Sequence, residues 1–161
     1  MLFVVDVGNS HTVSGLYDNG QLLGSWRLQS HQDKTADELA LRYHGLFQMH
    51  RLDPMAIGGF VVASVVPTQE TSWLRFANTY LTNLKHPPLN VHAGIKLDMG
   101  IEVEHPEEVG ADRLVNAVAA WDQIRAPLIV IDFGTAITFD CVNATPAYVG
   151  GTIHAGIGIS L

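Results

Sequence analysis

The chain has 161 residues, of which 47% are hydrophobic and 16% charged, and its formal net charge is −7. This composition is that of a globular protein with a sizeable core, and an acidic chain without a Lys/Arg cluster argues against a nucleic-acid-binding surface. No apolar run reaches membrane-spanning length, the single cysteine cannot form an internal disulfide, and the N-terminus lacks the basic segment of a signal peptide, so we expect a cytoplasmic protein.

The first two thirds of the chain predict an alternation of strands and helices. Apolar runs bounded by turn residues predict strands, and apolar side chains at helical spacing predict helices. The strands are expected at residues 2–7, 12–18, 21–29, 60–66 and 89–92, and the helices at 35–49 and 68–81. Asp18-Asn19-Gly20 is typical of a hairpin turn, and Thr35 is expected to begin the first helix with two acidic residues in its first turn.

The last third predicts a helix followed by a second set of strands. Pro106-Glu107-Glu108 has the residues of a helix start, and a helix is expected over residues 111–124. Strands begin again at Leu128. Three strands followed by helices, begun twice, indicate an α/β fold of two related ribonuclease-H-like (actin-like ATPase) domains with mixed sheets. We expect an N-terminal domain over residues 1–111, and a linking helix with the first strands of a second, incomplete domain over 112–161.

A segment of the chain is repeated. Leu2–Val13 recurs 126 positions later as Leu128–Phe139, each copy being an apolar run, an Asp, one apolar residue, a Gly and a second β run. Two matching hairpins at this distance indicate two related domains, each offering a carboxylate and a tight turn to a shared cleft.

Each repeated hairpin has the residues of a phosphate site. We expect Gly8 and Gly134 to turn the backbone with positive φ and to bring N–H groups close to an anion. Asp6 and Asp132, at strand ends, would need a cationic partner such as Mg²⁺ beside the phosphate. The alternative for either copy is an ordinary hairpin with a capping Asp, but the repetition favours the functional interpretation. Neither copy is a P-loop.

A third motif, Glu108-Val109-Gly110-Ala111-Asp112-Arg113, lies where the first domain meets the predicted linking helix. One interpretation is an N-cap with a surface ion pair. The functional interpretation is a base beside an anion clamp: Asp112 accepts the proton of a hydroxyl that attacks a γ-phosphoryl group, and Arg113 holds a substrate carboxylate through two N–H bonds.

Together these segments resemble type III pantothenate kinases. The resemblance covers the whole chain, and its motifs, in order, are Asp6-x-Gly8-Asn9-Ser10, Thr35-Ala36-Asp37-Glu38, Ser64-Val65-Val66-Pro67, Gly110-Ala111-Asp112-Arg113, Asp132-Phe133-Gly134-Thr135-Ala136 and Gly150-Gly151-x-Ile153. It implies phosphorylation of pantothenate by ATP with Mg²⁺ in coenzyme A biosynthesis, a monovalent cation (K⁺ or NH₄⁺), and a homodimer with the site near the subunit interface.

The resemblance also implies a role for each matching residue. The catalytic proton acceptor is Asp112, the monovalent-cation ligand is Asp132, and a contact to the ATP phosphates is Thr135. The pantothenate contacts are Gly110, Ala111, Asp112 and Arg113. The first phosphate loop comprises Asp6, Val7, Gly8, Asn9, Ser10, His11, Thr12 and Val13.

The sequence departs from the family pattern at three places. Ser10-His11 stands where Thr-Asn is common, Val103 where many members have a substrate-contacting Tyr, and Ala155 where a Pro is usual.

Two other classes of function are a non-catalytic regulatory or accessory transcription factor on the same fold, and an inactive fragment that folds only with a partner chain. The intact Asp6, Asp112 and Asp132 argue against the regulatory protein, and exposed apolar surface would favour the fragment.

Overall fold

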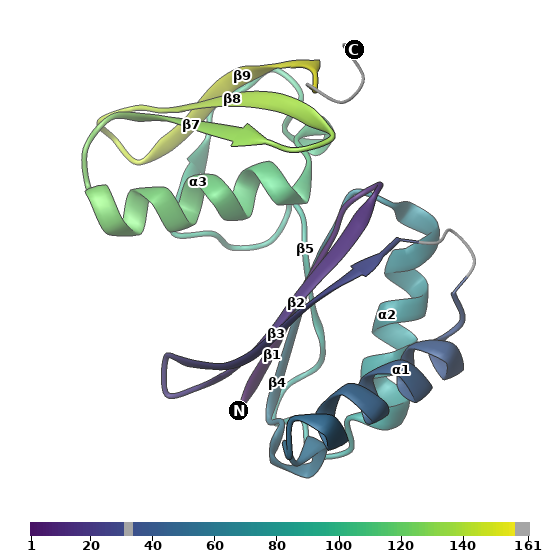
Figure 1. The fold of residues 1–161 in the computed structure, drawn as a ribbon. Helices are drawn as coiled ribbons and strands as arrows, with labels where there is room; N and C mark the ends of the chain where they lie inside the picture. Colours follow the sequence, from purple (N-terminus) through teal and green to yellow (C-terminus); the bar gives the residue numbers. More distant parts are fainter. Residues whose placement is uncertain (31–33, 157–161) are drawn as a thin grey trace. The chain divides into compact units, whose positions relative to one another are not determined.

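The computed structural model describes residues 1–30 and 34–156 (Figure 1). The chain forms two compact units, Met1–Val91 (unit 1) and His92–Leu161 (unit 2).

Unit 1 is a five-stranded sheet with two helices on one face (Figure 1). The strands are β1 (Leu2–Val7), β2 (His11–Asp18), β3 (Gln21–Gln29), β4 (Gly59–Ser64) and β5 (Leu89–Val91). The helices are α1 (Ala36–Met49) and α2 (Pro67–Tyr80), with a 3₁₀ turn, η1, at Pro54–Ala56. The strand order is β3-β2-β1-β4-β5, and the sheet is mixed because β1 runs antiparallel to β2 and parallel to β4.

Local sequence explains where the elements of unit 1 begin and end. Asn19 and Gly20 have positive φ values of 47° and 81°, which fit the predicted two-residue hairpin turn between β2 and β3. The Thr35 side chain caps α1 by accepting from the Glu38 N–H, while Glu38 accepts from the Thr35 N–H, a complete capping box. Pro67 occupies the first turn of α2, where its missing N–H costs nothing.

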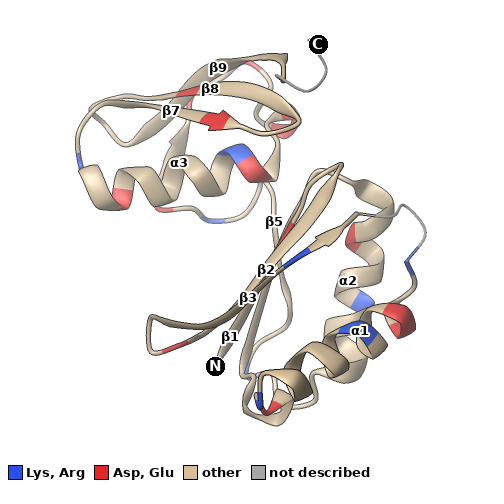
Figure 2. Ribbon diagram, viewed as in Figure 1, with Lys and Arg blue, Asp and Glu red and all other residues tan. Residues whose placement is uncertain are grey.

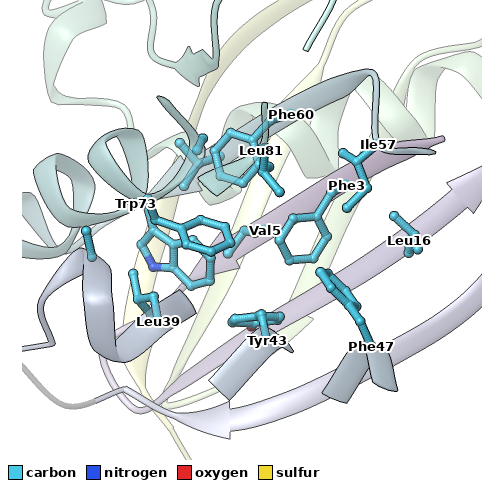
Figure 3. Close-up of a cluster of buried hydrophobic side chains, with 14 of the residues drawn as sticks. Phe3, Val5, Leu16, Leu39, Tyr43, Phe47, Ile57, Phe60, Trp73 and Leu81 are labelled. Carbon is cyan, nitrogen blue, oxygen red and sulfur yellow. The ribbon is translucent and has the colours of Figure 1, made fainter. Parts of the chain in front are cut away.

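The core of unit 1 lies between the sheet and the two helices (Figure 3). Phe3 on β1 is fully buried and meets Tyr43 and Phe47 of α1 edge to face, with ring centroids 5.2 and 5.4 Å apart. Trp73 of α2 packs on the same cluster, 6.4 Å from the Phe3 ring. Aromatic rings at these distances bury a large apolar area and fix how the helices pack on β1.

Unit 2 is a four-stranded mixed sheet with one long helix. Its elements are β6 (Gly100–Ile101), the 3₁₀ turn η2 (Pro106–Glu108), α3 (Ala111–Ile124), β7 (Leu128–Phe133), β8 (Ala136–Val142) and β9 (Ala147–Ala155). The order is β6-β9-β8-β7. The helix α3 packs on one face through a small core of Met99, Ala117, Val142 and Tyr148.

The compact units divide the chain between Val91 and His92, earlier than the expected boundary between residues 111 and 112. The reason is that β6 pairs in parallel with β9, and the Glu102 N–H donates to the Tyr148 carbonyl at 2.8 Å. Residues 92–111 therefore pack with the second sheet. The division into two related domains at 111/112 stays a prediction.

The fold class predicted from sequence is confirmed: both sheets are mixed, and the predicted helices and main strands are present within a few residues. The two-residue strand β6 lies in a segment expected to be loop or weakly β. Over residues 1–30 and 34–156, no helix combines the length and the hydrophobicity needed to cross a membrane.

A buried hydrogen bond between Ser14 Oγ and Tyr43 Oη, 2.9 Å long, joins β2 to α1, and substitutions at these two residues test this packing. Burial raises the pKa of Tyr43 to about 12, so its hydroxyl stays protonated. Either Ser14→Ala or Tyr43→Phe leaves one buried polar atom unpaired, and each should lower the free energy of unfolding by about 1–3 kcal/mol.

The double variant should cost less than the sum of the single variants, because it leaves neither group unpaired. Urea denaturation followed by circular dichroism measures all three. Tyr80→Phe is the control, because the exposed Tyr80 hydroxyl bonds Asp37 and its loss should change stability by no more than about 0.5 kcal/mol. Additive losses would contradict the coupling.

Candidate functional site

The repeated segment forms the same hairpin in both units. In unit 1, β1 pairs with β2 and Asp6 lies opposite Val13, while in unit 2, β7 pairs with β8 and Asp132 lies opposite Thr138. In each turn the glycine N–H donates a hydrogen bond across the turn: Gly8 N donates to His11 O at 3.0 Å, and Gly134 N donates to Ala136 O at 2.9 Å. The second turn is one residue shorter, so the ungapped match in sequence shifts by one position after the turn.

The expectation of positive φ at Gly8 and Gly134 is wrong, because neither is among the residues with positive φ. Close approach explains Gly8 instead: a Cβ there would lie 3.1 Å from the His11 carbonyl oxygen that closes the turn. A Cβ at Gly134 would lie in ordinary contact, 3.5 Å from the Ala136 carbonyl. The first turn therefore has the stricter need for glycine.

The eight residues predicted to form the first phosphate loop divide by exposure. Asp6, Asn9 and Val13 are exposed, whereas Val7 and Thr12 are buried. Gly8, Ser10 and His11 are half-buried. Val7 and Thr12 point to the helix-covered side of the sheet, so they can offer a ligand only their backbone atoms.

Polar side chains from β3 and the residue after it hold this loop in place. Ser30 Oγ donates to the Gly8 carbonyl at 2.6 Å, and Ser30 N donates to the Ser10 carbonyl at 3.0 Å. Ser30 Oγ also lies 2.9 Å from Thr12 Oγ1, and Arg27 Nη2 lies 3.2 Å from His11 Nδ1. Sequence analysis did not single out Ser30 or Arg27, which lie close to the loop only because β3 pairs with β2.

The third motif begins α3. Gly110 is the N-cap residue, and Asp112 is the second residue of the helix. Asp112 Oδ1 accepts a hydrogen bond from its neighbour's backbone, Arg113 N, at 2.7 Å. The alternative of an Asp112 N-cap with a surface ion pair is therefore wrong, because Gly110 caps the helix and Arg113 pairs elsewhere.

Asp112, the predicted proton acceptor, lies near Asp132, the predicted ligand of the monovalent cation. Asp112 and Asn116 are four residues apart and so lie on one face of α3. Asn116 Nδ2 donates to Asp132 Oδ2 at 3.3 Å, which joins this helix face to the end of β7. Asn116 was missed in the sequence, although its i,i+4 spacing from Asp112 was visible there.

The surroundings of Asp112 favour the protonated form of its carboxyl group more than solvent does for an exposed Asp. Burial raises its pKa above the ordinary value, and the negative charges of Asp132 and Asp140 raise it further. The Arg113 N–H bond and the Arg113 charge act in the opposite direction. A carboxylate raised in pKa by its surroundings in this way is typical of a general base.

Arg113 is held by a buried acid that sequence analysis missed. Arg113 Nε donates to Asp140 Oδ1 at 2.6 Å, and Nη2 lies at the same distance without the alignment of a hydrogen bond. Tyr148 Oη donates to the same oxygen at 2.7 Å, and the Tyr148 pKa is raised by burial and by this bond. Asp140 lies inside a strand, where the sequence carries no motif that marks it.

The predicted phosphate contact Thr135 and two of the departures from the family pattern, Val103 and Ala155, lie in unit 2. Thr135 is exposed in the β7–β8 turn. Val103 packs against the apolar core of the unit, and Ala155 ends β9 opposite Ala136. In the part of the chain that the structure describes, no three His, Cys, Asp or Glu side chains are grouped closely enough to hold a metal ion by themselves.

A hollow of about 420 Å³ lies between α1 and α2 in unit 1. It is mostly apolar and is lined by Asp37, Leu41, Tyr43, His44, Phe76 and Tyr80, among others. None of its lining residues belongs to the predicted site. In the residues that the structure describes, Lys and Arg are scattered along each unit (Figure 2).

Solved structures share this fold at low sequence identity. A putative N-acetylglucosamine kinase from Porphyromonas gingivalis matches 98% of this chain and 47% of its own, with a TM-score of 0.52 and 12% identity. A putative 2-dehydro-3-deoxygalactonokinase from Sinorhizobium meliloti matches 95% of this chain and 53% of its own, with a TM-score of 0.51 and 10% identity. At these identities the likeness concerns the fold alone.

Curated protein sequences are much more similar to this chain than these solved structures are. The type III pantothenate kinase of Desulfotalea psychrophila is 52% identical over the whole chain, and that of Anaeromyxobacter sp. (strain Fw109-5) is 46% identical. This chain spans 61% and 62% of the lengths of these relatives. The sequence profile of the type III pantothenate kinase family matches residues 2–161. The chain therefore belongs to the type III pantothenate kinase family.

Proposed function

We propose that this chain binds pantothenate and supplies the catalytic base for its phosphorylation by ATP, the first step of coenzyme A biosynthesis. The observation that carries the proposal is the setting of Asp112: a half-buried carboxylate at the start of α3, raised in pKa, with Arg113 beside it and Asp132 nearby. Family membership supplies the substrate, because the relatives are named for pantothenate.

The proposed reaction is a direct transfer. The pantothenate hydroxyl oxygen attacks the γ-phosphorus of ATP, a new O–P bond forms, and the bond to the β–γ bridging oxygen breaks to release ADP. Asp112 accepts the proton that the hydroxyl loses. Gly110, Ala111 and Arg113 contact the pantothenate, and the Arg113 cation attracts its carboxylate.

We assign the phosphates to the two repeated turns. The exposed backbone of Asp6–Val13 and the hydroxyl of Thr135 would bind phosphate oxygens. Mg²⁺ bound with the nucleotide would neutralise phosphate charge. Because Mg²⁺ commonly takes one or two carboxylates together with phosphate oxygens and water, the exposed Asp6 fits this role without a cage of protein ligands.

Asp132 is proposed as the ligand of a monovalent cation. Asp132 is exposed at the end of β7, and its carboxylate accepts a hydrogen bond from Asn116. The carboxylate oxygens can contact K⁺ or accept hydrogen bonds from NH₄⁺. We further propose a homodimeric, cytoplasmic enzyme, as the family resemblance implies. No observation on the described residues or among the relatives favours the regulatory alternative.

The kinase proposal predicts that Asp112→Asn lowers kcat by about 10²–10⁴-fold, because the amide nearly keeps the shape but cannot accept the proton. Phosphorylation of pantothenate by Mg-ATP is measured with and without K⁺ or NH₄⁺. The assay uses this chain alone and this chain co-expressed with the part of the D. psychrophila kinase that lies outside the match.

The exposed Asp98→Asn is the matched control and should leave kcat unchanged. Near-normal turnover by Asp112→Asn would remove Asp112 from the mechanism. Inactivity of the parent chain in both formats would contradict the kinase proposal for this chain.

The raised pKa of Asp112 also predicts a pH-dependent stability change. The folded chain binds this proton more tightly than the unfolded chain does, so Asp112 makes the free energy of unfolding fall as pH rises through the interval between the two pKa values. Above that interval the ionised Asp112 destabilises the fold. Asp112→Asn should therefore be more stable than the parent at pH 7, since Asn Oδ1 can still accept from Arg113 N.

The difference should vanish as pH falls below about 4, where Asp112 is protonated in both states. Urea denaturation across this pH range measures it, with Asp98→Asn as the control that should show no such difference. A variant less stable than the parent at pH 7 would show that the ionised Asp112 stabilises the fold.

A further inference from the structure

Asp140 is a fully buried acid for which the proposed reaction has no role. It lies on β8 with no exposed surface, and its side chain faces α3. A buried carboxylate is costly unless charged and hydrogen-bonding partners surround it. Here Oδ1 receives Arg113 Nε and Tyr148 Oη, and Oδ2 receives Thr138 Oγ1 at 3.2 Å.

The same contacts restrict Arg113. Its side chain is 14% exposed, its Nε and Nη2 both face Asp140, and its guanidinium carbon lies 5.8 Å from the centre of the Tyr148 ring. A Cβ on Gly151 would lie 2.5 Å from Nη2, so β9 also approaches the guanidinium closely. The Nε edge is therefore bound within the protein, which leaves the opposite edge of the planar fork for a ligand.

We propose that Asp140 is a positioning residue that holds the Nε edge of Arg113 and thereby aims the rest of the guanidinium at the substrate carboxylate. This inference rests on the proposed function. It also changes how Arg113 acts: the side chain holds the carboxylate by the edge that Asp140 leaves open, in one fixed orientation. Fixing a binding group before the ligand arrives lowers the entropic cost of binding.

The first test is kinetic. Asp140→Asn removes the charge but keeps the shape, and it should raise KM for pantothenate by about tenfold or more, the effect of losing a hydrogen bond to a charged group. It should lower kcat less, because Asp112 is intact. The control is Asp122→Asn, at an exposed position of α3. An active kinase in which Asp140→Asn leaves KM unchanged would overturn the proposal.

The second test separates positioning from a purely structural ion pair. Arg113→Met combined with Asp140→Leu replaces the buried pair by apolar side chains, which commonly preserves folding. Under the proposal this double variant folds but keeps a high KM, and Asp140→Leu adds nothing to KM once Arg113 is Met. A double variant with the KM of the parent would show that the pair serves the fold alone.

The third test does not depend on kinase activity. In NMR spectra of ¹⁵N-labelled chain, the Arg113 Nε–H should exchange slowly with water in the parent and rapidly in Asp140→Asn. Tyr148→Phe, which keeps the ion pair, should retain slow exchange. If the parent fails to phosphorylate pantothenate yet shows this difference, the proposed function fails while the positioning of Arg113 stands. Equal exchange in parent and Asp140→Asn would overturn the positioning itself.

Discussion

The chemistry of both units depends on the period-two alternation of β1 and β7. In each strand the aspartate lies on the face opposite three alternating apolar residues, which in β1 are Phe3, Val5 and Val7. Val5 and Asp6 are therefore neighbours in sequence but lie on opposite sides of the sheet. A shift of one residue in either register would move the carboxylate into the apolar layer. The aromatic cluster around Phe3 opposes such a shift in unit 1, because it accepts only the apolar face.

The repeat uses this alternation differently in the two units. In unit 1 the helices α1 and α2 lie on the apolar face, and Asp6 is exposed on the other. In unit 2 the helix α3 lies on the carboxylate face, where Asn116 contacts Asp132. One hairpin pattern thus supports a hydrophobic core in one unit and an acidic cluster beneath a helix in the other. Burial raises the pKa of Asp112, and the negative charges of Asp132 and Asp140 raise it further, so the shift depends on packing rather than on any single motif.

The pair of Arg113 and Asp140 shows why neighbours in a motif need not be partners in space. The sequence suggested that Asp112 and Arg113 act side by side. In the structure, Asp112 bonds the backbone of Arg113, while the Arg113 side chain turns to a carboxylate 27 residues away in the chain. The buried ion pair requires a complete set of donors around Asp140, and Tyr148 and Thr138 provide them from two strands.

The sequence by itself determined the secondary structure, the repeated hairpin and the family, because these depend on local periodicity, turn residues and the order of motifs. The Asn19-Gly20 turn and the Thr35 cap are local in this sense. Only the tertiary structure decided the contacts that join distant segments: Ser30 on the first loop, Asn116 on Asp132, and Asp140 on Arg113. These contacts depend on strand register and on which face a helix covers. Strand register and helix placement cannot be inferred from the identity of the residues concerned, since an Asp inside a strand is the same residue type whether it faces solvent or a buried arginine.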